Sequence, residues 1–138
     1  MEIDLATSDE RKIHIKELIQ SSNKTETLIF DKKSYECKVI EVDPRYLLYR
    51  LSNTRTKLKQ RTYILKQDKA SDFFHPDREE NQEVQEAQHE ILLSQNLTAL
   101  KGSYDRKGGQ DEALVIYPDG KIINGNTRTA FMRHEGMS

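Results

Sequence analysis

The sequence is poor in cysteine and has no long apolar run, and each shortage excludes a class of protein. Cys37 is the only cysteine among 138 residues, which excludes an internal disulfide and a cysteine-rich zinc site. No segment approaches the ~18 consecutive apolar residues that a membrane span needs. The opening residues, MEIDLATSDERK, carry acids early and hold no apolar stretch long enough for a secretory signal. We therefore expect a cytoplasmic protein with no membrane partner.

Charge is abundant but unevenly distributed. The formal net charge is only −1, although 33% of the residues are charged. Residues 44–69 hold eight basic residues and one acid, whereas residues 77–90 hold six acids and one arginine. The basic members are Arg45, Arg50, Arg55, Lys57, Lys59, Arg61, Lys66 and Lys69. The first block favours phosphate and the second repels it, so the average charge is a poor guide to partners.

The N-terminal part predicts a helix. Ser8 is placed to cap a helix that runs to about Ser21, with acids in its first turn. Its narrow apolar face is expected to consist of Ile13, Leu18 and Ile19.

The next segment predicts a hairpin and then becomes harder to interpret. Residues 27–30 and 35–42 have the composition of strands on either side of an Asp-Lys-Lys-Ser turn. Pro44 interrupts the sheet pattern. Residues 46–51 could make a helical turn, and the β-branched and aromatic content of residues 61–66 is typical of a strand.

The C-terminal half alternates helices and short strands. A helix is predicted over residues 77–95, because Val84, Ala87, Ile91 and Leu92 share one face. A short helix over residues 97–104 and a Lys-Gly-Gly bend at residues 107–109 should follow. Strands at 113–117 and 121–123 flank a Pro-Asp-Gly turn, and the last helix is predicted over Asn126–His134. The fold class is therefore α+β, with a small mixed sheet flanked by helices.

The junction before the last helix has the residues of an anion site. Gly125 permits positive φ and lets the backbone approach a ligand closely. The N–H groups of Asn126 and Thr127 would begin the helix without intrahelical partners, and Arg128 could close over an anion. The alternative is a plain hairpin-to-helix junction in which Asn124 or Asn126 caps the helix.

The wider run GGQDEALVIYPDGKIINGNTRTAFMRHEG resembles the central motif of the ParB/sulfiredoxin superfamily. Residues 109–113 stand at the lead-in to a strand, and Leu114–Ile116 at the strand itself. Gly125 and Arg128 match the Gly-x-x-Arg signature, and Ala130 matches the alanine on the buried face of the following helix. The resemblance implies a ParB/sulfiredoxin-like fold and a phosphate pocket at this junction.

An earlier element adds to the resemblance. The segment VIEVDPRYLLYRLSNTRT supplies a strand, Asp43-Pro44 and then Asn53-Thr54-Arg55, similar to the Asn-x-Arg element of the superfamily. The resemblance implies that Asn53 and Arg55 join Arg128 at one polyanion pocket.

Two departures restrict what the resemblance implies. Sulfiredoxins carry Gly-Cys-His-Arg, but Asn126 and Thr127 stand at the middle positions here, and Cys37 falls on a distant expected strand. Sulfiredoxin chemistry is therefore not expected, and Cys37 is interpreted as a small buried apolar residue. Chromosome-segregation ParB proteins carry Gly-Glu-Arg-Arg in a CTP-binding clamp domain. The loss of one carboxylate and one cation leaves triphosphate binding better supported than hydrolysis.

The two charged blocks each have two interpretations. Arg45, Arg50, Lys57, Lys59 and Arg61, interleaved with tyrosines, could bind a nucleic-acid backbone, or they could form a solvated surface. The acids of residues 79–90 are interpreted as the wet face of a helix. The alternative is that they dock onto the basic block of a second copy, which makes a homodimer a candidate partner. No metal site is predicted, although Asp72, His75 and Asp77 form a weak candidate cluster.

The leading function is a ParB-like domain that binds a nucleoside triphosphate (CTP or ATP, with or without Mg²⁺) or a polyphosphate. It would belong to a DNA-associated bacterial or phage protein of partition, DNA modification or defence. Residues 1–34 would form an N-terminal helix and first strand, and residues 35–138 a core that is truncated if the chain is a fragment. The sequence leaves catalysis open. One alternative is a nuclease or NTP hydrolase using acids among Asp111, Glu112 and Asp119, and another is a DNA-binding module without a nucleotide site.

Overall fold

The first helix, α1, has the bounds that its local sequence predicts, but tertiary packing determines which of its residues are buried. The computed structural model describes residues 2–95, 97–107 and 114–136, with no side-chain description at 30, 103, 104 and 107. Helix α1 spans Ser8–Ser21, as predicted, but its cap is Thr7, whose hydroxyl accepts a hydrogen bond from the Glu10 backbone N–H. Of the predicted apolar face, Leu18 and Ile19 are half-buried, but Ile13 was wrong: it is 59% exposed, and the fully buried residue is Ile15.

The predicted hairpin is confirmed. Strand β1 (Thr25–Phe30) pairs antiparallel with β2 (Lys33–Lys38). Asp31 and Lys32 both have positive φ, as a two-residue turn between right-twisted strands requires. Strand β2 ends four residues before Val42, where the strand was predicted to end. The predicted division of the chain into residues 1–34 and 35–138 falls inside β2. Cys37 lies on β2 and is half-buried.

The segment after the hairpin is extended, and the predicted helical turn over residues 46–51 was wrong. A 3-10 turn, η1 (Pro44–Tyr46), comes first. Leu48 then forms a parallel bridge with Lys121, in which the Leu48 N–H donates to Gly120 O and Leu48 O accepts from the Ile122 N–H, both at 3.0 Å. The segment is covered on both sides, because Leu47, Leu48, Tyr49 and Leu51 are all buried. A strand buried on two faces reads as a continuous apolar run, which resembles a helical turn in sequence.

The predicted strand over residues 61–66 was also wrong. After η2 (Thr54–Thr56), helix α2 spans Lys57–Gln67. Its inner face, Gln60, Tyr63 and Ile64, packs toward the core, whereas Leu58 and Leu65 remain exposed. Gln60, Tyr63 and Ile64 have the i, i+3, i+4 spacing of one helix face, and burying this face stabilises a helix despite the β-branched residues of the segment.

Helix α3 carries the predicted apolar face but starts later than predicted. It spans Gln82–Leu93, after the 3-10 turn η3 (Pro76–Arg78), because Asn81 caps it by accepting from the Val84 N–H at 3.1 Å. The four predicted core residues, Val84, Ala87, Ile91 and Leu92, are all buried. The acids beside them are not simply a wet face, since Glu79 is only 8% exposed and Glu86 is half-buried.

The remaining elements follow the predicted order. Helix α4 spans Thr98–Lys107, β3 spans Val115–Ile116, β4 spans Ile122–Asn124 and α5 spans Asn126–His134. The last helix therefore has its predicted bounds, and the Pro-Asp-Gly turn joins β3 to β4. The predicted bend at residues 107–109 lies largely outside the described residues.

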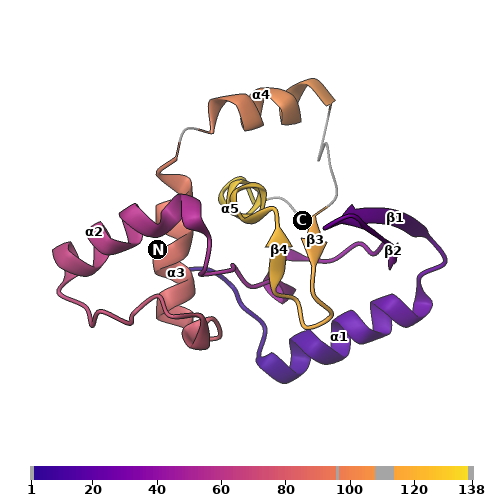
Figure 1. The fold of residues 1–138 in the computed structure, drawn as a ribbon, viewed down its shortest axis with the longest axis horizontal. Coiled ribbons are helices and arrows are strands. Elements are labelled where there is room, and N and C mark those ends of the chain that lie inside the picture. Colours follow the sequence, from indigo (N-terminus) through magenta and orange to yellow (C-terminus); the bar gives the residue numbers. More distant parts are fainter. Residues whose placement is uncertain (1, 96, 108–113, 137–138) are drawn as a thin grey trace.

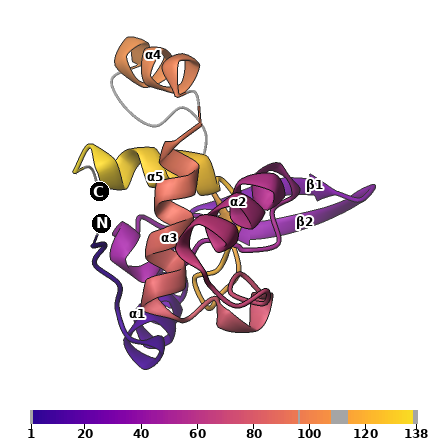
Figure 2. The same cartoon turned by 90° about the vertical axis from the view of Figure 1, so that its left-hand side faces the viewer.

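The elements gather around two apolar clusters. One lies between α2 and α3 and contains Leu51, Phe73, Phe74, Val84, Ala87 and Ile91. The other lies between α3, β4 and α5 and contains Leu47, Tyr49, Leu92, Ile122 and Ala130. Figures 1 and 2 show α5 crossing beside the end of α3, α1 along the lower edge, and α4 apart from the other elements.

The α+β class is confirmed, but the strands are arranged differently from the prediction. Within the described ranges they form two separate antiparallel pairs, joined to the rest by the Leu48–Lys121 bridge rather than by one mixed sheet. In the same ranges, no helix combines the length and apolar character needed to cross a bilayer.

Candidate functional site

The extended segment Leu47–Leu51 is held on one side by side chains of α2, of α3 and of the lead-in to α3. The Tyr49 N–H donates to Gln85 Oε1 at 2.8 Å, and Gln85 Nε2 donates back to Tyr49 O at 3.0 Å. The Leu51 N–H donates to Glu79 Oε2 at 2.8 Å, and Leu51 O accepts from Gln60 Nε2 at 3.0 Å. These side chains replace the backbone groups that a neighbouring strand would offer, so the position of the segment is fixed along its whole length.

The other edge of the segment leads to the start of α5. After the bridge at Leu48, the Arg50 N–H donates to Asn126 Oδ1 at 3.0 Å, and Asn126 is only 6% exposed. Because the segment runs parallel to β4, the carboxyl ends of both point toward the N-terminus of α5 (Figure 1). Ligand sites in sheets with parallel strands form at this end of the strands.

The N-terminus of α5 is built around Gly125. Gly125 has φ 117°, no side chain caps the helix, and its carbonyl accepts from both the N–H and the hydroxyl of Thr129 at 2.9 Å. The predicted capping by Asn124 or Asn126 is therefore not observed. Arg128 Nη2 lies 3.5 Å from the point that a Cβ on Gly125 would occupy, so the guanidinium lies over the helix start. The guanidinium thus lies beside the glycine that precedes α5, near the end of the helix whose first N–H groups have no intrahelical partner.

The C-terminal end of α3 completes the surroundings of this junction. The Thr127 hydroxyl donates to Gln95 Oε1 at 3.1 Å. One residue earlier, the Ser94 hydroxyl accepts from Lys59 Nζ at 3.0 Å, which brings α2 to the same end of α3. Lys59 and Arg128 thus bring cations from α2 and α5 to this end of the molecule, whereas Arg50 is linked to it by its backbone N–H and its guanidinium donates to Ser52 Oγ at 3.0 Å.

The other predicted site residues lie in η2, in α2 and before the extended segment. Asn53 caps η2 by accepting from the Arg55 N–H at 3.0 Å, and the Arg55 side chain is exposed. Arg45 lies before the segment, where its guanidinium donates to Asp4 at 3.1 Å and to the Tyr46 hydroxyl at 3.0 Å. Lys57 and Arg61 are exposed on α2. The shared pocket of Arg55 and Arg128 stays a prediction.

Several residues of the junction were not predicted from sequence. Gln95 positions Thr127, and Gln85 and Glu79 position the segment that carries Arg50. The available signal for Gln85 is its spacing, because Gln85 and Gln88 lie seven and four residues before Leu92 and so share its face of α3, where both are fully buried. A buried glutamine must find hydrogen-bond partners, which identifies it as a structural contact. Asn126 likewise uses its side chain for structure, whereas its backbone was the predicted ligand.

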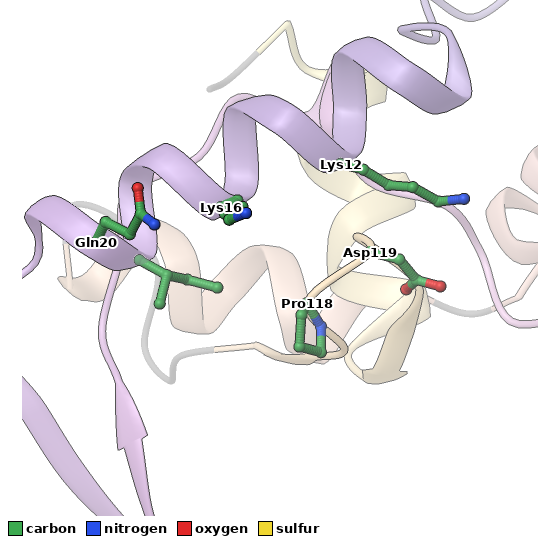
Figure 3. Close-up of a pocket in the computed structure, with 6 residues that line it drawn as sticks. Lys12, Lys16, Gln20, Pro118 and Asp119 are labelled. Carbon is green, nitrogen blue, oxygen red and sulfur yellow. The ribbon is translucent and has the colours of Figure 1, made fainter.

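The described residues contain no group of three or more histidine, cysteine or acidic side chains that could hold a metal ion. In the weak candidate cluster, His75 Nδ1 instead accepts from the Asp77 N–H at 3.1 Å. An open groove lies between α1 and the β3–β4 turn, lined by Lys12, Lys16, Ile19, Gln20, Pro118 and Asp119 (Figure 3). This groove is at the start of β4, opposite to the end that leads into α5, and contains none of the predicted phosphate-binding residues.

Comparison with known proteins gives no relative: no family model, curated protein or solved structure matches this chain.

Replacement of Gly125 by alanine should destabilise the junction. Alanine is strained at φ 117°, and its Cβ would overlap Leu114 Cδ2. We expect the free energy of unfolding to fall by about 2–3 kcal/mol. Gly136→Ala is the matched control, because Gly136 also has positive φ but meets no atom within 4 Å, so about 1 kcal/mol is expected there. Equal losses in the two variants, measured by urea unfolding, would show that the Leu114 contact is unimportant.

Proposed function

We propose that the N-terminus of α5 binds a phosphate group of a nucleotide, CTP or ATP, in a DNA-associated bacterial or phage protein. The observation that carries the proposal is the hydrogen bond from the Arg50 N–H to Asn126 Oδ1. It brings the carboxyl end of the Leu47–Leu51 segment to the helix start over which the Arg128 guanidinium lies. A polyphosphate is the ligand that would use an N-terminal helix dipole and several separate cations together.

Each of the proposed residues contacts a different part of the ligand. The N–H groups of Asn126 and Thr127 and the guanidinium of Arg128 hold one phosphate. Arg50 and Lys59 neutralise the adjacent phosphates, and Arg55 adds a further cation from η2. The Thr127 hydroxyl, oriented by Gln95, contacts a phosphate oxygen or a water bound to Mg²⁺. Mg²⁺, when bound with the nucleotide, would screen the repulsion between its phosphates.

This assignment agrees with the resemblance of Gly125–Arg128 and Asn53–Arg55 to the ParB/sulfiredoxin superfamily, and we propose a ParB-like role for the domain. Nucleotide binding would act as a switch that orders the domain rather than as fast catalysis. The side chain of Asn126, at the position of the glutamate in chromosome-segregation ParB proteins, is held by the Arg50 backbone. This side chain therefore has a structural role, and the residues at this site favour nucleotide binding over hydrolysis.

The hydrolytic alternative depends on Asp111, Glu112 and Asp119, of which Asp119 is among the described residues. Asp119 closes the β3–β4 turn, where its Oδ1 accepts from the Lys121 N–H at 3.1 Å and its carbonyl accepts from Arg11 Nε at 2.6 Å. It lies at the other end of β4 from Gly125. Asp111 and Glu112 lie outside the described residues. Mg²⁺-dependent release of phosphate, or Mg²⁺-dependent cleavage of DNA, would favour the nuclease or NTP hydrolase.

Nucleotide titration tests the proposal. The folded chain is titrated by calorimetry with ATP, CTP, GTP and ADP, with and without Mg²⁺, and we expect at least one triphosphate to bind. Arg128→Gln should weaken that binding at least about tenfold, since a charge-assisted contact contributes about 1.5–3 kcal/mol. The control is Arg78→Gln, because Arg78 lies near the start of α3, and its guanidinium packs over the Phe73 ring.

Comparison of Arg50→Gln with Arg55→Gln then separates two forms of the pocket. A loss with Arg55→Gln supports the pairing implied by the superfamily, whereas a loss confined to Arg50→Gln assigns the second cation to the extended segment. Failure of all four nucleotides to bind the folded chain would sink the proposal.

DNA association is the second candidate function, favoured by the exposure of Lys57, Arg61 and Lys66 on a helix that carries no acid. Binding through these cations alone would ignore nucleotides and weaken steeply as salt increases.

A further inference from the structure

The outward face of α2 presents two leucines to solvent. Leu58 is 74% exposed and Leu65 is 82% exposed. They lie seven residues apart, two turns along the helix, and the exposed Thr62 lies between them. The opposite face, with Gln60 and Ile64, packs on the core. Two large apolar side chains on one face of a solvent-exposed helix indicate a contact with another molecule more than they indicate a nucleic-acid surface.

The shape and charge of this face specify what would cover it. Leu58, Arg61, Thr62 and Leu65 have the i, i+3, i+4, i+7 spacing of four residues that form a hole for one side chain of a facing helix. Arg61 lies on one flank of the leucines and Lys66 on the other, and α2 contains no acid. The complementary helix would carry one exposed apolar side chain with acids near it.

Helix α1 has that pattern on its own outward face. Ile13 is 59% exposed, while Arg11 and Ile15 form the buried face of α1. Glu10 and Glu17, three residues before and four after Ile13, lie on one flank of Ile13, and Lys16, three residues after it, lies on the other; all three are exposed. The apolar residue and the two acids thus match the hole and cations of α2.

We propose that α1 of one copy docks on α2 of a second copy, with Ile13 between Leu58 and Leu65 and Glu17 beside Arg61. Figures 1 and 2 place α1 along the lower edge of the molecule and α2 at another side. In the proposed contact each copy offers its two faces to two different neighbours, so the interface is heterologous and the assembly grows beyond a dimer. Two short helices bury a small area, so the association is weak and depends on concentration. The contact is independent of the proposed nucleotide site.

Sedimentation equilibrium of the whole chain tests the contact. At low salt, between about 10 µM and about 1 mM, we expect the weight-average mass to rise past that of a dimer. Added salt should reduce the association, because the flanking charges are exposed. Leu65→Ser should weaken it at least about tenfold, without a loss of folded stability, since Leu65 is already in solvent.

A charge exchange identifies the two faces. Glu17→Arg and Arg61→Glu should each weaken association, and the double variant should recover most of the wild-type association by reversing the pair. Arg106→Glu, on the exposed surface of α4, is the matched control and should leave association unchanged.

Three results would overturn the proposal: a monomer over the whole concentration range, association insensitive to Leu65→Ser, or no recovery in the double variant. A chain that stays monomeric but loses duplex DNA binding with Arg61→Glu would assign α2 to nucleic acid instead.

Discussion

Replacement of Gln85 by methionine is expected to lower the free energy of unfolding by about 3–9 kcal/mol, because three buried backbone groups lose a partner at about 1–3 kcal/mol each. These groups are the N–H and carbonyl of Tyr49 and the carbonyl of Glu79, at 2.8–3.0 Å from the Gln85 amide. Methionine keeps the length of the side chain and removes its hydrogen bonds. Since a domain is stable by only about 5–15 kcal/mol, this variant should unfold at much lower urea concentrations.

Gln82→Met is the matched control on the same helix. Gln82 also donates to a carbonyl, that of Ile3 at 2.7 Å, but its side chain is exposed. Water can replace that bond, so we expect a loss of about 1 kcal/mol or less. If the two variants lost equal stability, the contacts from α3 would not be what holds the Leu47–Leu51 segment.

The contrast between Gln85 and Gln82 also explains which parts of the fold could be predicted. Helix α5 and the β1–β2 hairpin depend on residues adjacent in sequence, such as Gly125 and the Asp31-Lys32 turn, and both were predicted. The Leu47–Leu51 segment depends on partners from Lys121 and Gln85, far along the chain, and its conformation was predicted wrongly. Local preference decides a segment only where distant contacts do not oppose it.

The same distinction applies to the candidate site. Gly125 and Arg128 were found from sequence, because a glycine with positive φ at the start of a helix is a local signal. Arg50 and Lys59 were assigned to a nucleic-acid surface. Arg50 contacts Asn126 on α5, and Lys59 contacts Ser94 at the end of α3. No spacing in the sequence predicts these two contacts.

The buried pair of Tyr49 and His89 predicts a loss of stability in mild acid. The Tyr49 hydroxyl lies 2.6 Å from His89 Nδ1, and both residues are almost completely buried. Burial, and then the nearby cation of Arg133, lower the pKa of His89 from 6.5 to about 4. Burial also raises the pKa of Tyr49, so its hydroxyl keeps its proton and can donate it to a neutral imidazole. A protonated ring would carry a proton on Nδ1 and could no longer accept that bond.

The direction of the pH effect follows from these values. The unfolded chain takes up the His89 proton near pH 6.5, whereas the folded chain takes it up only near pH 4. The stabilisation is therefore fully present above pH 6.5 and is lost as the pH falls toward 4. The loss reaches about 3 kcal/mol, at 1.36 kcal/mol for each unit of difference. The carboxylates Glu80 and Glu83, whose pKa values are lowered from 4.5 by Arg11 and Lys69, add their own loss only at more acidic pH.

His89→Asn separates the His89 effect from every other titration. Asparagine offers an acceptor near the position of Nδ1 and does not titrate, so unfolding between pH 6.5 and 4.5 should depend much less on pH in this variant. His75→Asn is the control: His75 is exposed, and its replacement should leave the wild-type slope intact. In the folded chain, the NMR chemical shifts of the His89 ring protons should change with a midpoint near pH 4. A midpoint near 6.5 there, or equal slopes in all three proteins, would show that protonation of His89 does not oppose the fold.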